Sequence, residues 1–281
     1  EPPPEEPEPV ALLTTPPAQV HPCPPLPNCP HGLLVVGPLD LDTQEKEAIA
    51  ALAQATGWPI IADPASSLRH GPHTNKALVL SAGEHIFRSA WADQHTPEVV
   101  VQLGALPTSK AYRLWLDRAR PAQIITVDHA GRHPDPLLLV TERIDLAPAD
   151  WAARVTVAHT KDLSWSQAWQ EAERTAAAAV ADLSAHAPFN NPAVVDVLGA
   201  QLSAQTALVV GNSMPIRDLD AFLPAGPKPL QVYANRGANG IDGQVSTALG
   251  VAAGHDESTV FFTGDLTLLH ALSGWSAARR L

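Results

Sequence analysis

From His31 onward, short apolar runs without internal polar alternation are separated by longer stretches with helical spacing of apolar residues. Such runs are typical of strands in a parallel sheet that is covered by helices on both faces. The predicted strands of this part are residues 32–37, 59–63, 77–80, 99–104 and 123–128. The predicted helices are residues 42–57, 84–92 and 109–119, the first opened by a capping box of Asp42 and Glu45. We therefore expect one doubly wound α/β domain over residues 31–160.

The same alternation continues after a long alanine-rich helix predicted over residues 164–185. Asn191 and Pro192 are typical of an N-cap and a first-turn proline, so a helix is expected from there to Leu202. Strands are predicted at 207–212, 230–235 and 258–265, with helices from about Asp242 and over 266–280. Residues 161–190 therefore connect to a second doubly wound parallel-sheet domain, over 191–281, of which we expect only the N-terminal part.

Polar side chains follow the three strands predicted in this second domain. Asn212 and Ser213 follow the first, Asn235 and Arg236 the second, and Gly264 and Asp265 the third. Because the carboxyl ends of parallel strands meet at one edge of a sheet, these groups are expected on one rim, where open α/β sheets bind ligands.

Residues 1–30 contain twelve of the 28 prolines and neither Lys nor Arg. This composition predicts an extended linker and suggests that the chain is cut from a larger protein. The only cysteines, Cys23 and Cys29, lie in this segment. A zinc site with His21 and His31 is the alternative to free thiols, but the spacing matches no usual ligand pattern, so we favour reduced, unpaired cysteines.

The net charge of −11 argues against a nucleic acid or an anionic membrane as the main partner. No apolar run approaches the roughly 20 residues of a membrane span. The N-terminal sequence lacks the basic and apolar regions of a signal peptide, so we expect a cytoplasmic protein. The apolar fraction of 45% is sufficient for sizeable cores.

Gly237, Gly240 and Gly243 have a spacing that differs from the dinucleotide-binding fingerprint. They either make a tight connection or let bare backbone approach a ring or a phosphate. Asp265, between a predicted strand and a predicted helix, is either the N-cap of that helix or an oxygen ligand for Mg²⁺. A single carboxylate is sufficient for Mg²⁺ when substrate or cofactor phosphates complete its coordination.

Ser213 and Arg217 lie four residues apart after one strand, and Arg236 follows the next strand. Two guanidinium groups on one rim are suited to bind carboxylates in bidentate fashion. The alternative is that Arg217 pairs with Asp218 or Asp220 on a solvent-exposed helix face.

The segments GNSMPIRDLDAF, YANRGANGIDGQVSTALGVAAG and VFFTGDLTLLHALSG closely resemble the family of 2-succinyl-5-enolpyruvyl-6-hydroxy-3-cyclohexene-1-carboxylate (SEPHCHC) synthases, thiamine-diphosphate enzymes of menaquinone biosynthesis. The resemblance is strongest over residues 207–281. It is weaker over 31–160, where GALPTSKAYRLWL is similar to the family's central-domain motif. The GDL of this chain marks this branch, since most thiamine-diphosphate relatives carry GDG.

The resemblance implies a central domain followed by the first part of a diphosphate-binding domain. It implies thiamine diphosphate with Mg²⁺ or Mn²⁺, and a transferase that decarboxylates 2-oxoglutarate and adds the four-carbon carbanion to isochorismate. Homodimers or homotetramers are implied for the full-length protein. The implied substrate-binding residues are Lys110, Ser213, Arg217 and Arg236. The implied cofactor-binding residues are Asn212, Gly240, Ile241, Gly264, Asp265 and Leu266, with Asp265 as the metal ligand.

Some features depart from the family pattern. The catalytic glutamate belongs to the family's N-terminal domain, and a second metal ligand would follow Leu281, so we expect no catalytic residue in this chain and no activity from it alone. Ala271 and Ser273 replace an expected Asp and Asn, and Trp275 replaces a small aliphatic residue. The alternatives are a related decarboxylase or carboligase with another 2-oxo acid substrate, and a non-catalytic binding module.

Overall fold

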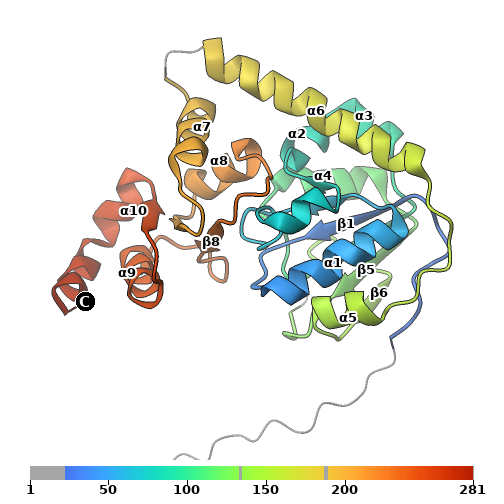
Figure 1. Ribbon diagram of the computed structural model, residues 1–281, viewed down its shortest axis with the longest axis horizontal. Coiled ribbons are helices and arrows are strands. Elements are labelled where there is room, and N and C mark those ends of the chain that lie inside the picture. The colour runs from blue at the N-terminus through green and yellow to red at the C-terminus, as the bar shows by residue number, and fades with distance from the viewer. Residues whose placement is uncertain (1–22, 133–134, 187–188, 281) are drawn as a thin grey trace, which may run out of the picture.

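The computed structural model describes residues 23–132, 135–186 and 189–280 and consists of two α/β units side by side (Figure 1). Each unit contains one parallel sheet, with six strands in the first and three in the second. The two-domain α/β architecture predicted from the apolar runs is therefore confirmed.

The first sheet has the strand order β3-β2-β1-β4-β5-β6, and every neighbouring pair is parallel. This is a doubly wound order that reverses between β1 and β4. Its strands are β1 Gly32–Val36, β2 Ile60–Ala62, β3 Val79–Leu80, β4 Val99–Leu103, β5 Gln123–Val127 and β6 Glu142–Ile144. Its helices are α1 Thr43–Thr56, η1 Pro72–Asn75, α2 Gly83–Ile86, α3 Ala90–Gln94, α4 Lys110–Ala119, α5 Pro148–Arg154 and α6 Leu163–His186.

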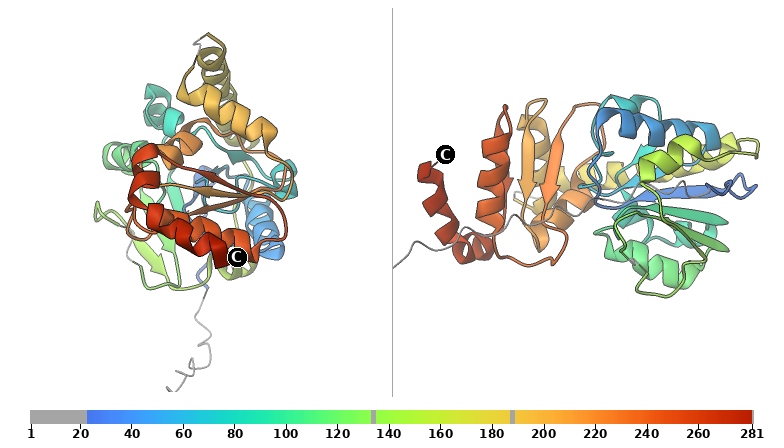
Figure 2. Two further views of the ribbon diagram at one scale, coloured as in Figure 1. Left: turned by 90° about the vertical axis from the view of Figure 1, so that its left-hand side faces the viewer. Right: turned by 90° about the horizontal axis from the view of Figure 1, so that it is seen from below.

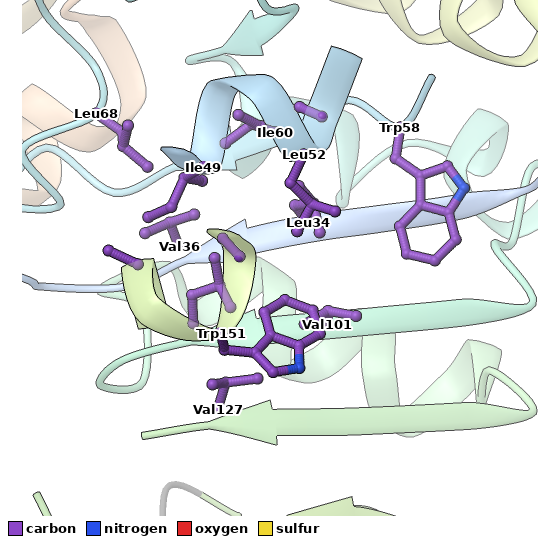
Figure 3. Packing of buried hydrophobic residues seen from close by; sticks show 14 of the residues in the cluster. Leu34, Val36, Ile49, Leu52, Trp58, Ile60, Leu68, Val101, Val127 and Trp151 are labelled. Carbon is purple, nitrogen blue, oxygen red and sulfur yellow. The ribbon is translucent and has the colours of Figure 1, made fainter. Parts of the chain in front are cut away.

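Alternate residues of β1 enter two different cores. Leu34 and Val36 face a cluster with residues of α1 and α5, while Leu33 and Val35 face one with residues of α2, α4 and α6. Figure 3 shows the first cluster, in which Trp151 of α5 lies over the sheet; this tryptophan is 1% exposed. Because both faces are covered, the strands carry apolar residues without alternation, as predicted.

The described end of the proline-rich segment contributes to the first core. Leu26 and Cys29 are 4% and 5% exposed and belong to the cluster of α1 and α5. The sequence reasoning assigned these residues to an extended linker, whereas their apolar side chains pack against the domain. Both cysteines are free, and burial raises the pKa of each thiol. Residues 1–22 of the predicted linker, His21 included, lie outside the described residues.

The second unit has the strand order β8-β7-β9, with β7 Ala207–Val210, β8 Gln231–Ala234 and β9 Thr259–Phe262. Helices α7 Asn191–Gln201 and α8 Met214–Phe222 pack on one face, where Leu208 and Val210 join their apolar residues. Helix α9 Gln244–Gly254 contacts β7 and β9, and α10 Asp265–His270 and η2 Leu272–Arg280 follow. Figure 2 shows α10 and the C-terminal turns at the end farthest from the first unit.

Several predicted boundaries are wrong. The helix expected near residues 84–92 is divided into α2 and α3, and the one expected over 266–280 changes to 3-10 geometry after His270. The N-cap of α7 is Asn190, whose side chain accepts from the Ala193 N–H, and not Asn191, whose amide donates to Asp218. Strand β6 was not predicted. The capping box of Asp42 and Glu45 is confirmed, with both hydrogen bonds present.

Candidate functional site

A cavity of about 1190 Å³ lies between the two units. It is lined by residues that follow β1, β4 and β5 of the first sheet and β7 and β8 of the second, such as Pro38, Ala105, Arg132, Ser213 and Arg236. The carboxyl edges of both parallel sheets therefore meet at one cavity. Its volume is sufficient for more than one small metabolite.

The first sheet presents its topological switch point to this cavity. The loops after β1 and β4 approach so closely that a Cβ on Gly37 would overlap the carbonyl oxygen of Ala105. Ligands of open α/β sheets bind at the crevice where the strand order reverses. The close loop contact thus makes the floor of the cavity at that crevice.

Lys110 is the first residue of α4 and is exposed to the cavity. The backbone around it is held from two sides. Asp63, which is 2% exposed, accepts from the Thr108 N–H at 2.7 Å. Glu84 accepts from the Ser109 hydroxyl at 2.6 Å and from the Ala111 N–H at 3.2 Å. The lysine side chain itself makes no hydrogen bond or ion pair within the described part of the chain.

Ser213 precedes α8 with φ of 73° and ψ of −128°, and its side chain makes no capping hydrogen bond. A positive φ at a non-glycine residue is strained, and such strain concentrates at functional sites. This backbone turn leaves the serine hydroxyl exposed at the cavity instead of bonded to its own helix.

Arg217 does not form an ion pair with Asp218 or Asp220, the alternative to carboxylate binding that the sequence left open. Asp220 is bound to Arg69 at 3.0 Å, and Asp218 accepts from the Asn191 amide at 3.1 Å. Burial raises the pKa of Asp218, while the hydrogen bond from Asn191 and the charge of Arg217 act in the opposite direction. Among the described residues Arg217 makes no hydrogen bond or ion pair, so its guanidinium is available to the cavity.

Arg236 is fixed by Asn212, which lies at the end of β7 and is 1% exposed. The Arg236 Nη1 donates to Asn212 Oδ1 at 2.8 Å. The Asn212 Nδ2 donates to the carbonyls of Asn235 at 2.9 Å and Gly240 at 2.7 Å. Burial and the charge of Arg217 both lower the pKa of Arg236, whereas two carboxylates raise it. The positive charge of Arg217 near Arg236 favours the binding of an anion in this part of the cavity.

The sequence reasoning missed Arg113, which lines the same cavity from α4. It stands three residues after Lys110, and residues at this spacing share a helix face, which is the signal that was available. Arg88 and Arg132 also line the cavity, but they pair with Glu84 and Asp128. Among the Lys and Arg side chains that line the cavity, those without a carboxylate ion pair in the described chain come from both units: Lys110, Arg113, Arg217 and Arg236.

The residues proposed for a cofactor lie at the carboxyl edge of the second sheet but outside this cavity. Gly240 and Ile241 belong to the loop between β8 and α9, where the Gly240 carbonyl accepts from Asn212 and from Gln244. An exposed contact of 3.5 Å between Asp242 and His270 joins this loop to α10. Through this contact, the glycine loop lies next to α10, the helix that begins at Asp265.

Asp265 is the first residue of α10 and not its N-cap, a position that Gly264 takes. Its Oδ1 accepts from the Leu266 N–H at 2.8 Å, and the side chain is exposed. A Cβ on Gly264 would meet open space, and Leu266 is 71% exposed. The preceding Thr263 has a buried hydroxyl with no partner in the described structure. The open space at Gly264 is therefore bordered by one exposed carboxylate, that of Asp265, while the Thr263 hydroxyl is buried close to Gly211.

Two further searches cover the described residues only. None of their helices is both long and apolar enough to cross a membrane. No group of three or more His, Cys, Asp or Glu side chains in these segments is arranged to hold a metal ion.

Comparisons with known proteins identify the family of this chain. Residues 28–210 match the family model described as the middle domain of thiamine pyrophosphate. Among curated proteins, the chain is 42% identical over 257 residues to the SEPHCHC synthase of Geobacillus kaustophilus, covering 88% of this chain and 43% of that protein. It is 38% identical over 256 residues to that of Chloroflexus aurantiacus, covering 88% and 43%. It is 36% identical over 269 residues to that of Synechococcus elongatus, covering 94% and 45%. The chain spans less than half the length of these relatives.

Proposed function

Because the chain belongs to the family of middle domains of thiamine pyrophosphate enzymes, we propose that it is part of a SEPHCHC synthase of menaquinone biosynthesis. The observation that carries this proposal is the cavity between the units, into which both contribute cationic side chains without carboxylate partners. The names of the similar proteins from Geobacillus, Chloroflexus and Synechococcus support the same assignment.

The substrates are 2-oxoglutarate and isochorismate, which both carry two carboxylates. Arg217 and Arg236 bind carboxylate oxygens through their planar N–H groups, and Lys110 adds a positive charge from the first unit. Ser213 donates its hydroxyl, which its strained backbone turns away from α8. Fixed cations of this kind also stabilise negative charge that develops during reaction.

Thiamine diphosphate and Mg²⁺ or Mn²⁺ fit the edge beside β9. Asp265 offers an exposed carboxylate, Gly264 adds no side chain, and the hydroxyl of Thr263 lacks a partner among the described residues. A diphosphate would complete the metal sphere that one carboxylate begins. The bound cofactor supplies the electron sink that decarboxylation of a 2-oxo acid requires.

Residues Gly240, Ile241, Gly264, Asp265 and Leu266 are the cofactor-binding set of this proposal. Asn212 belongs to the same set and also positions Arg236, because its amide bonds to Arg236, Asn235 and Gly240. We assign residues 31–160 to the central domain, 161–190 to the connection and 191–281 to the diphosphate-binding domain. The full-length protein is a cytoplasmic homodimer or homotetramer, and this chain alone is inactive.

The test is the consumption of isochorismate by the full-length protein, followed by ultraviolet absorbance with 2-oxoglutarate, thiamine diphosphate and Mg²⁺. Consumption that requires all components is the expected result. Release of CO₂ from 2-oxoglutarate or another 2-oxo acid without use of isochorismate would instead indicate a related decarboxylase. A folded protein that binds the cofactor and consumes neither substrate would indicate a binding module.

A further inference from the structure

Arg69 is a buried guanidinium that bonds to both units at once. It lies in the loop after β2 and is 1% exposed. On the side of the first unit, its Nε and Nη2 donate to the carbonyl of Ala62, at 2.9 and 2.6 Å. These two bonds hold the guanidinium plane against the end of β2.

The other N–H groups of Arg69 reach the C-terminal end of α8 in the second unit. Nη1 donates to the carbonyls of Leu219, Asp220 and Leu223, at 2.9, 3.1 and 3.2 Å. Nη2 pairs with the Asp220 carboxylate at 3.0 Å, and this carboxylate is 9% exposed. The last carbonyls of a helix lack intrahelical donors and carry the negative end of its dipole, so a cation there is favoured.

Hydrogen bonds between uncharged groups of the two units surround the contact of Arg69 with α8. The Gly71 N–H donates to the Gly226 carbonyl at 2.9 Å, and the Gly226 N–H donates to the Arg69 carbonyl at 3.1 Å. The His85 Nε2 lies 2.8 Å from the carbonyl of Ala221. Arg69 thus stands at the centre of the contact between the units, at the opposite end of α8 from Ser213.

We propose that Arg69 is a positioning residue that sets the orientation of α8, and with it the place of Arg217, relative to Lys110. The proposal rests on the proposed function of the cavity as a site for dicarboxylates. Helix α8 is a rigid element of nine residues that carries Arg217 in its first turns. A tilt at its C-terminal end therefore moves Arg217, while Lys110 stays with the first unit. Buried ion pairs contribute more to a specific arrangement than to stability in some proteins, which is the role assigned here.

The kinetic test uses the full-length enzyme with Arg69→Lys, which keeps the charge but cannot reach Ala62 and the α8 carbonyls together. Arg69→Gln is the second variant if the first does not fold. We expect the KM for 2-oxoglutarate or isochorismate to rise roughly tenfold, the scale of a lost charge-assisted contact. In an Arg217→Ala background the same change should leave KM nearly unaltered, because no guanidinium remains to be positioned.

A purely structural role gives a different pattern. Partial unfolding lowers the apparent kcat and leaves KM unchanged, in both backgrounds. That result, or an equal rise of KM with and without Arg217, would overturn the proposal. Arg118→Lys is the matched control, since Arg118 pairs with Asp93 inside the first unit and does not line the cavity.

A second measurement is independent of activity. Spin labels at Leu114→Cys on α4 and Val197→Cys on α7 occupy exposed positions, 52% and 62% accessible, in different units. Accessible native cysteines are replaced by serine, and labelled protein is diluted into unlabelled protein. Arg69→Lys should shift or broaden the distance distribution, whereas an unchanged distribution would contradict the positioning role. If the wild type turns over neither diacid, the proposed function fails, and this distance measurement still tests Arg69.

Discussion

The Nη1 of Arg236 donates to the Oδ1 of Asn212 at 2.8 Å, which joins the ends of β8 and β7 through a side chain that is 1% exposed. The same asparagine also holds the Asn235 and Gly240 carbonyls. One buried amide therefore connects a cavity guanidinium to the glycine loop beside it.

Asn212→Ala in the full-length enzyme should release Arg236 and leave buried carbonyls without a donor. Because hydrogen bonds to charged groups contribute roughly 1.5–3 kcal/mol, we expect kcat/KM to fall about 10- to 100-fold. Steady-state kinetics with varied 2-oxoglutarate and isochorismate would measure this. Asn75→Ala, an exposed asparagine of η1, is the matched control. Wild-type kcat/KM in Asn212→Ala would show that Arg236 keeps its place without this bond.

Arg217→Ala should raise the KM for at least one diacid by tenfold or more, on the order expected for a lost ion-paired contact. Arg217→Lys should recover only part of this loss, since an ammonium cannot bind a carboxylate in bidentate fashion. The readout is the dependence of rate on each substrate concentration. Arg118→Ala, outside the cavity, should behave like the wild type. Wild-type KM values in both Arg217 variants would remove Arg217 from the site.

Asp265→Asn should weaken the binding of the metal ion at the edge beside β9. A neutral amide is a poorer ligand for Mg²⁺ than a carboxylate, so the Mg²⁺ concentration for half-maximal activity should increase roughly tenfold. Titration of the metal-depleted full-length enzyme measures it. Asp256→Asn, an exposed aspartate just before β9, should not alter the titration. An identical metal dependence for both variants would argue against Asp265 as a ligand.

His70 makes the stability of this chain depend on pH. Burial, with a contribution from the charge of Arg69, lowers the pKa of this 6% exposed histidine from 6.5 to about 3. The unfolded chain takes up a proton below pH 6.5 and the folded chain does not, so this stability is present above pH 6.5 and is lost as the pH falls toward 3. At pH 5 the loss is about 2 kcal/mol.

Urea unfolding of the chain at several pH values between about 7.5 and 5 would measure this loss. His70→Phe keeps a ring in the site and cannot be protonated, so its free energy of unfolding should change less over the same range. The prediction fails if the variant and the wild type lose stability in parallel. His70 forms a β-bridge with Gly226 of the second unit, so its protonation would act at the contact between the two units.

Gly32→Ala tests the packing at the start of β1. A Cβ there would overlap the indole ring of Trp58, which is 1% exposed. Overpacking of this kind costs about 1–3 kcal/mol in the free energy of unfolding. Gly250→Ala in α9 meets open space and should stabilise the helix by roughly 0.5–1 kcal/mol. Denaturant titration of both variants would show opposite shifts of the midpoint if this account holds.

The sequence was a good guide to elements that have strong local signals. The strand β4 and the helix α4 lie within one residue of their predicted bounds, because a buried apolar run and the Ser109 cap define them locally. Strand β6 escaped prediction because Glu142 and Arg143 are exposed at the sheet edge and break the apolar pattern. Asn190 and not Asn191 is the N-cap of α7, whereas the Asn191 amide donates to Asp218 in α8, a long-range contact that no local pattern predicts.

By itself, the sequence determined the two α/β units, the polar residues at the strand ends and the resemblance to thiamine-diphosphate enzymes. It placed Lys110 and Arg217 in one candidate set only through that resemblance. Only the tertiary structure decided that both line one cavity, that Arg113 joins them, and that Arg69 connects the units. The physical reason is that strands and caps depend on neighbours in the chain, whereas the partners of Arg69 lie about 150 residues away. No local pattern encodes such a contact.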